Sequence, residues 1–208
     1  MAERDSGLAQ LERWTPMLFV VGGVIVIGFA ALEAVAAFTD TSYPRVRNVL
    51  TIGYVLGFVG LVGLYPVFAD RHPWLARAGA ASAALGAVGF SLNVIVSLGQ
   101  LAGLVAGEGP AWVNVFIPLV ILGMLVGYLS FGIASYRTPE YTQTVAFFLV
   151  VPAVLYAMVI VGTLTVGLGR WAFVFSSGMA LGIIGVGRRL RVEREADGDP
   201  KTTASPTT

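Results

Sequence analysis

The segment WTPMLFVVGGVIVIGFAALEAVAAF, residues 14–38, decides the fold class, because it is long, apolar and interrupted by one charged residue, Glu33. About 20 such residues cross the hydrocarbon core of a bilayer as an α-helix. A helix suits this environment because it satisfies its own backbone hydrogen bonds where lipid offers none. The segment therefore predicts a transmembrane helix, and it raises the question of why an acid lies within it.

The composition of the whole chain has the same character. Of the 208 residues, 56% are hydrophobic and 12% are charged, and the mean hydropathy is +0.81. A soluble domain carries about 25% charged residues, so this chain has too few charges to cover a surface in water. The composition predicts an integral membrane protein whose main contact is the lipid bilayer. A net charge of +1, confined to loops and tails, gives no reason to expect a nucleic-acid partner.

Polar residues, Pro and Gly divide the chain into six apolar segments, which predict an all-α bundle of six transmembrane helices. The third segment is longer than a bilayer requires, so we expect it to tilt or to project beyond the membrane. A short segment, 1–13, precedes the bundle, and a basic tail, 188–208, follows it, with a polar end that we expect to be disordered. The predicted spans are 14–38, 48–69, 74–105, 112–135, 143–167 and 170–187.

The distribution of basic residues predicts the orientation. Cytoplasmic loops of membrane proteins are enriched in Arg and Lys. If the chain begins in the cytoplasm, ten basic residues lie inside and three, Arg45, Arg47 and Arg170, lie outside. We therefore expect a cell-membrane protein with both termini cytoplasmic. The four Trp residues support the boundaries, because each lies at the start of a predicted span and indole prefers the headgroup region. They are Trp14, Trp74, Trp112 and Trp171.

One alternative concerns the first span. Ala34, Val35 and Ala36 have the small-x-small form of a signal-peptidase site. Against cleavage, the apolar run before them is longer than a usual signal core, and three acids lie in the first 13 residues. We favour retention of the first helix.

Small and polar residues follow single faces of several spans. Gly53, Gly57 and Gly60 recur on one face of the second span, and similar Gly patterns occur in the fourth and sixth. Small residues let membrane helices approach closely, so we interpret these faces as packing surfaces, within the chain or toward a second copy or another membrane protein. In the third span, one stripe either packs or lines a wet cavity. It comprises Ser82, Gly86, Gly89, Asn93, Ser97 and Gln100.

Glu33 and Asn93 each lie 19 residues beyond the Trp that opens their span, so we expect them at similar depth, close to the outer interface. One interpretation is that Glu33 is ionised and pairs with Arg45, Arg47 or Arg170. The other is an ion or proton site formed by Glu33 with Asn93, Ser97 and Gln100, because intramembrane acids are frequently functional.

Two segments each contain a predicted inner-loop motif, Arg71-His72-Pro73 in the first and Arg137-Thr138-Pro139 in the second. They are GLYPVFADRHPWLARAGAASAALGAVGF, residues 63–90, and FGIASYRTPEYTQTVAFFLVVPAV, residues 131–154. These segments resemble uncharacterised multi-pass membrane proteins of halophilic archaea and actinobacteria. The resemblance covers about a quarter of the chain. It implies a helical bundle and assigns no activity, cofactor or functional residue.

The residue inventory argues against an enzyme. The chain has no Cys and a single His, His72, which excludes thiol chemistry and the usual zinc sites, and we expect no metal or cofactor. Ser176 and Ser177 have no nearby His or Lys in the sequence to activate them. Two classes remain: an accessory, structural or sensory membrane protein, which we favour, and a small transporter or channel that uses Glu33 and the polar stripe.

Overall fold

The computed structural model describes residues 2–39, 41–107, 117–139 and 143–197, and within these ranges every regular element is a helix. Six helical spans are long and apolar enough to cross a membrane, which confirms the predicted number and type of segments. They are Gln10–Phe38, Pro44–Gly63, Pro73–Leu101, Ile117–Tyr136, Gln143–Val166 and Ala172–Glu193.

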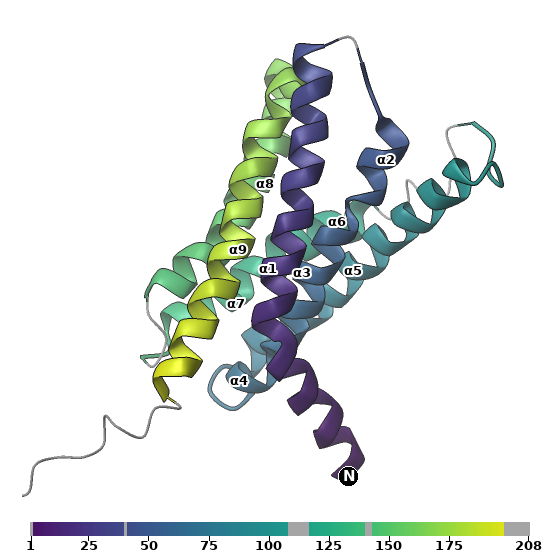
Figure 1. Ribbon diagram of the computed structural model, residues 1–208. Helices are drawn as coiled ribbons and strands as arrows, with labels where there is room; N and C mark the ends of the chain where they lie inside the picture. Colours follow the sequence, from purple (N-terminus) through teal and green to yellow (C-terminus); the bar gives the residue numbers. More distant parts are fainter. Residues whose placement is uncertain (1, 40, 108–116, 140–142, 198–208) are drawn as a thin grey trace, which may run out of the picture.

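Four of the six spans belong to single helices: α1 (Ala2–Phe38), α5 (Pro73–Leu101), α8 (Gln143–Val166) and α9 (Ala172–Asp197). The 29 residues of α5 are about 43 Å long, which exceeds a hydrocarbon core of about 30 Å. Figure 1 shows α5 inclined to α1. The helix α9 continues beyond residue 187, so the basic run that was predicted to begin a tail is helical up to Asp197; residues 198–208 lie outside the described residues.

The second span is divided into α2 (Pro44–Val49) and α3 (Ile52–Gly63), and a short helix, α4 (Tyr65–Ala69), follows it. Between α2 and α3 the backbone tightens, and the amide of Thr51 donates to the carbonyl of Asn48. The side chain of Thr51 donates to the same carbonyl at 2.6 Å, which competes with regular α-helical bonding. Pro66 has no amide hydrogen and lies in the first turn of α4, where that loss costs least.

The fourth span changes helix type within the membrane segment. It comprises α6 (Ile117–Leu122), a π-helical turn η2 (Gly123–Gly127) and α7 (Tyr128–Tyr136). A π-turn inserts one residue and so rotates the following helix relative to the preceding one. The predicted start of this span, including Trp112, lies outside the described residues. A 3₁₀ turn, η3 (Leu168–Trp171), joins α8 to α9.

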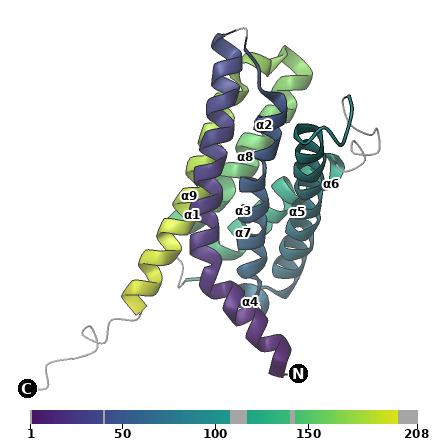
Figure 2. The ribbon, with the colours of Figure 1, turned by 45° about the vertical axis from the view of Figure 1, so that its right-hand side comes forward.

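The spans form a closed ring in which neighbours in sequence are neighbours in space. The helix α1 packs against α3, α3 against α5, α5 against α6 and η2, α7 against α8, and α8 against α9. The ring closes where α9 packs against α1, so the first and last spans lie side by side (Figure 1). The beginning of α1 and the end of α9 lie at the same end of the bundle (Figure 2).

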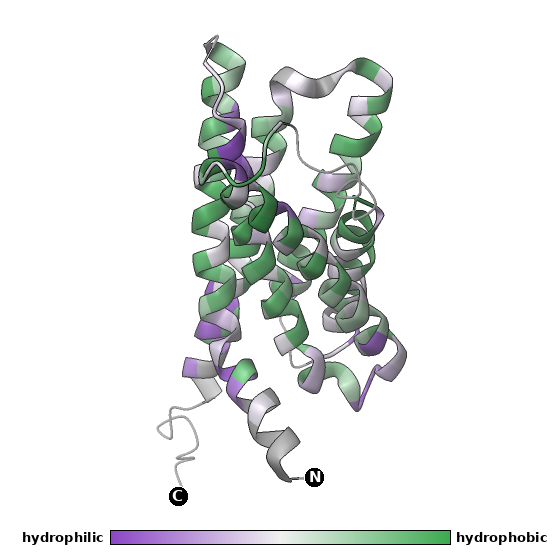
Figure 3. Cartoon of the chain, turned by 90° about the vertical axis from the view of Figure 1, so that its right-hand side faces the viewer, coloured by the Kyte–Doolittle hydropathy of each residue, from purple (hydrophilic) through white to green (hydrophobic). Residues whose placement is uncertain are grey.

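The core and the outer surface are both apolar. Phe19, Phe58, Met124 and Tyr128 are fully buried, whereas large apolar side chains such as Leu164 are exposed. Figure 3 shows hydrophobic residues along most of the bundle, with hydrophilic ones near its lower end and a further group in its upper half. An apolar exterior around a packed core is what a bilayer requires, and Trp14, Trp74 and Trp171 are exposed, as headgroup-level side chains would be.

Glycine allows the close approach of helices inside this ring. A Cβ atom on Gly22 of α1 would lie 2.6 Å from the carbonyl oxygen of Gly53 of α3, and one on Gly123 would lie 2.7 Å from the Cα of Gly86. Gly53, Gly57 and Gly60 are buried. The Gly face of the second span therefore packs within the chain, which leaves it no surface to offer to a second copy or another protein.

Candidate functional site

The carboxylate of Glu33 meets side chains from two other helices. Glu33 lies near the end of α1, and the hydroxyl of Ser176, on α9, donates a 2.6 Å hydrogen bond to its Oε2 atom. The hydroxyl of Tyr54, on α3, interacts with both Ser176 and Glu33. Ser176 and Tyr54 are buried, and Glu33 is half-buried. The acid is therefore bonded across the contact that closes the helix ring.

Arg47 provides the opposite charge. It lies on α2, and it interacts electrostatically with Glu33. Its guanidinium carbon lies 5.9 Å from the ring centroid of Phe29, a cation–π contact, and its Nε atom is buried without a hydrogen-bond partner. Glu33 and Arg47 line one cavity of about 420 Å³, whose other lining residues are Ala36, Ala37, Phe38, Thr39 and Gly169.

Of the two predicted partners whose side chains the structure describes, Arg45 and Arg47, it places Arg47 beside Glu33. Arg45, two residues earlier on α2, is exposed and is not among the residues that line the cavity. The side chain of Arg170 lies outside the described part of the chain. Residues 45 and 47 of a short helix point in different directions, and for that reason one of the two reaches the cavity.

The polar residues of the predicted stripe form hydrogen bonds away from Glu33. The side-chain amide of Asn93 donates to the hydroxyl of Thr51 at 3.3 Å, and that of Gln100 donates to the carbonyl of Gly107 at 2.9 Å. Ser97 is buried. None of these three stripe residues is among those that line the Glu33 cavity.

The small end of the stripe packs against the π-turn and its neighbours. A Cβ atom on Gly86 would lie 2.8 Å from the ring of Phe58 and 3.0 Å from the Cα of Gly123. Ser82 and Gly89 are buried. Of the two interpretations that the sequence leaves open, the packing one describes these contacts, and the structure does not bring the stripe and Glu33 into a common site.

Three polar residues of the interior were not singled out as candidate site residues by the sequence. Ser176 was considered only as a nucleophile, and Tyr54 and Tyr128 carried no distinguishing pattern. Tyr128 begins α7 directly after the π-turn, and its hydroxyl is fully buried without a hydrogen-bond partner. Gly57 makes room for it, because a Cβ atom there would lie 2.8 Å from that hydroxyl oxygen. The signal that could have identified these three residues in the sequence is a polar side chain within an apolar span.

The arrangement can hold a charge, because the Glu33 carboxylate accepts a hydrogen bond from Ser176 and lies near Arg47. Ser176 donates to a carboxylate, and Ser177 donates to the carbonyl of Phe173 within its own helix. Beside them, Tyr54 stacks on Phe90, with ring centroids 5.0 Å apart, and Phe58 stacks on the same ring. The fold and this site define a multi-pass helical membrane protein with a polar cavity at one end of its bundle.

No protein-family model matches the chain, and the searches of curated proteins and of solved structures found no similar protein. The resemblance to membrane proteins of halophilic archaea and actinobacteria therefore stays a prediction.

Proposed function

We propose that the protein is a non-enzymatic accessory, structural or sensory protein of the cell membrane, with both termini in the cytoplasm and the Glu33 cavity toward the outer side. The orientation is supported by the ten basic residues assigned to the inside and three assigned to the outside. It also agrees with the common end at which α1 begins and α9 ends (Figure 2).

The observation that carries this proposal is the use of the α5 stripe in packing. A transporter built on the stripe would need its polar groups to face a pathway. Instead, Asn93 bonds to Thr51, and Gly86 lies against Phe58 and Gly123. Phe58 and Tyr128 are fully buried, and they fill the core on the side of Tyr54 away from α2. We infer that the Glu33 cavity is closed toward the core and senses or stabilises rather than conducts.

A small transporter or channel is the second candidate, and the cavity itself favours it. A volume of about 420 Å³ falls within the range of small-molecule sites, and the pair of Glu33 and Arg47 could hold an ion or a small polar solute. A second conformation that opens the aromatic layer would be required. The transporter requires a solute flux across the membrane, whereas the accessory protein requires none.

Flux through reconstituted vesicles separates them. Purified wild type and Glu33→Gln are inserted into vesicles, and proton, Na⁺ and K⁺ fluxes are measured under an imposed membrane potential, together with glycerol entry by light scattering. We expect rates equal to those of protein-free vesicles, and stable co-purification with another membrane protein from native membranes. A solute flux that wild type supports and Glu33→Gln abolishes would instead establish the transporter.

A further inference from the structure

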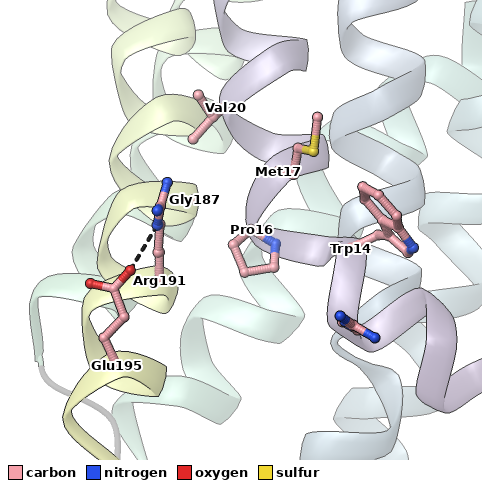
Figure 4. A pocket seen from close by; sticks show the side chains of 8 residues that line it. Trp14, Pro16, Met17, Val20, Gly187, Arg191 and Glu195 are labelled. Carbon is pink, nitrogen blue, oxygen red and sulfur yellow. Dashed lines mark hydrogen bonds and ion pairs between the residues drawn. The ribbon is translucent and has the colours of Figure 1, made fainter. Parts of the chain in front are cut away.

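A second cavity lies between α1 and α9 at the opposite end of their contact from Glu33. It has a volume of about 510 Å³ and is lined by residues between 13 and 20 of α1 and between 187 and 195 of α9. Figure 4 shows the lining residues, with Pro16 of α1 on the side of Gly187, Arg191 and Glu195 of α9, and with Trp14 and Met17 on the other side of α1. Arg13 and Val20 complete the lining.

The groove exists because the long contact between the two helices ends near Gly187, after which the helices diverge. A Cβ atom on Gly187 would lie 2.5 Å from the carbonyl oxygen of Pro16, so the backbones meet there. Beyond this contact the beginning of α1 and the end of α9 separate in both views (Figures 1 and 2). The resulting cleft is lined mainly by apolar side chains of α1, and its charged lining residues are Arg13, Arg191 and Glu195.

The exposed side chains of the groove are of the types that contact lipid at a membrane surface. The indole of Trp14 is 51% exposed, and the side chain of Met17 is 56% exposed beside it. Arg191 is exposed and forms an ion pair of 2.9 Å with Glu195 through its Nε atom. That contact leaves the terminal nitrogens of the same guanidinium to donate to a ligand, and an exposed pair of this kind rearranges at little cost.

The charge around the groove is positive. Arg13 and Arg191 outnumber Glu195 among the lining residues. Arg188 and Arg189 are exposed on the adjoining turn of α9, where they line a second groove with Phe148 and Leu181. Basic pockets between transmembrane helices at the cytoplasmic surface suit anionic lipid headgroups, and an apolar cleft beside them suits an acyl chain.

We propose that the groove between α1 and α9 binds one anionic phospholipid. Arg13 and Arg191 hold its phosphate, and an acyl chain lies against Met17 and Val20. The Trp14 indole covers the glycerol region. This goes beyond the function proposed above; it rests on the cytoplasmic orientation proposed there, and it involves neither Glu33 nor any flux.

The test measures lipid affinity of the full chain in detergent by native mass spectrometry. Phosphatidylglycerol is compared with phosphatidylcholine of the same acyl chains, and inorganic phosphate is offered as a competitor. We expect tighter binding of phosphatidylglycerol, and a loss of about tenfold in that affinity for the double variant Arg13→Gln, Arg191→Gln. The control is Arg77→Gln with Arg137→Gln, which removes two exposed charges elsewhere and should change the affinity by less than about twofold.

A second pair of variants tests the acyl-chain contact. Met17→Ser should weaken phosphatidylglycerol binding about threefold, whereas Met158→Ser, a similarly exposed Met on α8, should leave it unchanged. The proposal is overturned if wild type binds both lipids equally, or if the control charges matter as much as Arg13 and Arg191. It is also overturned if inorganic phosphate displaces the lipid at equal concentration, since the groove would then be a phosphate site.

Discussion

The contact between α1 and α9 is held in different ways at its two ends. At one end, Ser176 of α9 bonds across the interface to Glu33 of α1 at 2.6 Å, beside buried Tyr54. At the other, Arg191 pairs with Glu195 within α9, both side chains are exposed, and an open groove separates the helices. A buried polar bond between helices fixes their position, whereas an exposed pair within one helix contributes little. The first end is built to hold the helices, and the second leaves room for a ligand.

The middle of this contact should be the most sensitive to substitution. A Cβ atom on Gly23 of α1 would lie 2.9 Å from the carbonyl oxygen of Ala180 of α9 and 2.5 Å from the Ile184 side chain. We expect Gly23→Ala to lower the free energy of unfolding by about 2–3 kcal/mol, because the two backbones must separate. Denaturation in detergent measures this. A Cβ atom on Gly28 would lie 3.5 Å from the nearest atom, on Leu50, which is an ordinary contact. The control Gly28→Ala should therefore be neutral or slightly stabilising.

The hydrogen bond at the Glu33 end should have an intermediate effect. Ser176→Ala removes the donor to a partly buried carboxylate, and we expect a loss of about 1–2 kcal/mol in the free energy of unfolding. The neighbouring Ser177 bonds only within its own helix, so Ser177→Ala should cost less than about 0.5 kcal/mol. Equal effects of the two substitutions would mean that the bond across the interface does not hold α1 against α9.

Two tyrosines provide a finer test of the same region. The hydroxyl of Tyr54 interacts with Ser176, and that of Tyr128 is buried without a partner. Tyr54→Phe should cost about 1 kcal/mol, whereas Tyr128→Phe should be neutral or stabilising, because it removes an unsatisfied buried group. Melting midpoints of both variants decide this. A large loss for Tyr128→Phe would show that its hydroxyl has a bonding partner in the membrane.

The smallest effect is expected at the groove end. Glu195→Gln removes an exposed pair whose side chains are 77% and 65% accessible, and the free energy of unfolding should fall by less than about 0.5 kcal/mol. Thermal denaturation at low and moderate salt measures the change. A loss as large as that of Ser176→Ala would contradict the distinction between the two ends.

The sequence predicts the number and type of the spans because crossing a bilayer requires long apolar segments, and Glu33 stands out because it interrupts one. It does not reveal the break at Thr51 or the π-turn before Tyr128, since both depend on local side-chain and packing contacts. It also cannot identify neighbouring helices. For that reason Asn93 was grouped with Glu33 on depth alone, while Ser176 entered the site only when α9 was placed against α1.

Among the three candidate arginines, the choice of Arg47 also required the structure. The sequence predicts that the basic residues of the first loop and of the segment before the sixth span can approach Glu33. The direction of each side chain follows from α2, a helix of six residues that periodicity alone does not predict separately from the span behind it. The short helix α2 thus determines that Arg47, rather than Arg45, lines the Glu33 cavity.

The central claim is that Glu33 is kept as a charged, structural group bonded to α9 and facing Arg47. The most direct test compares the melting midpoints of wild type and Glu33→Gln between about pH 4 and 9, because Gln keeps the size of the side chain and removes its charge. We predict that wild type is the more stable at neutral pH and that its advantage disappears as the carboxylate takes up a proton in acid. If Glu33→Gln is equally or more stable at neutral pH, the acid is not kept for folding, and the account is contradicted.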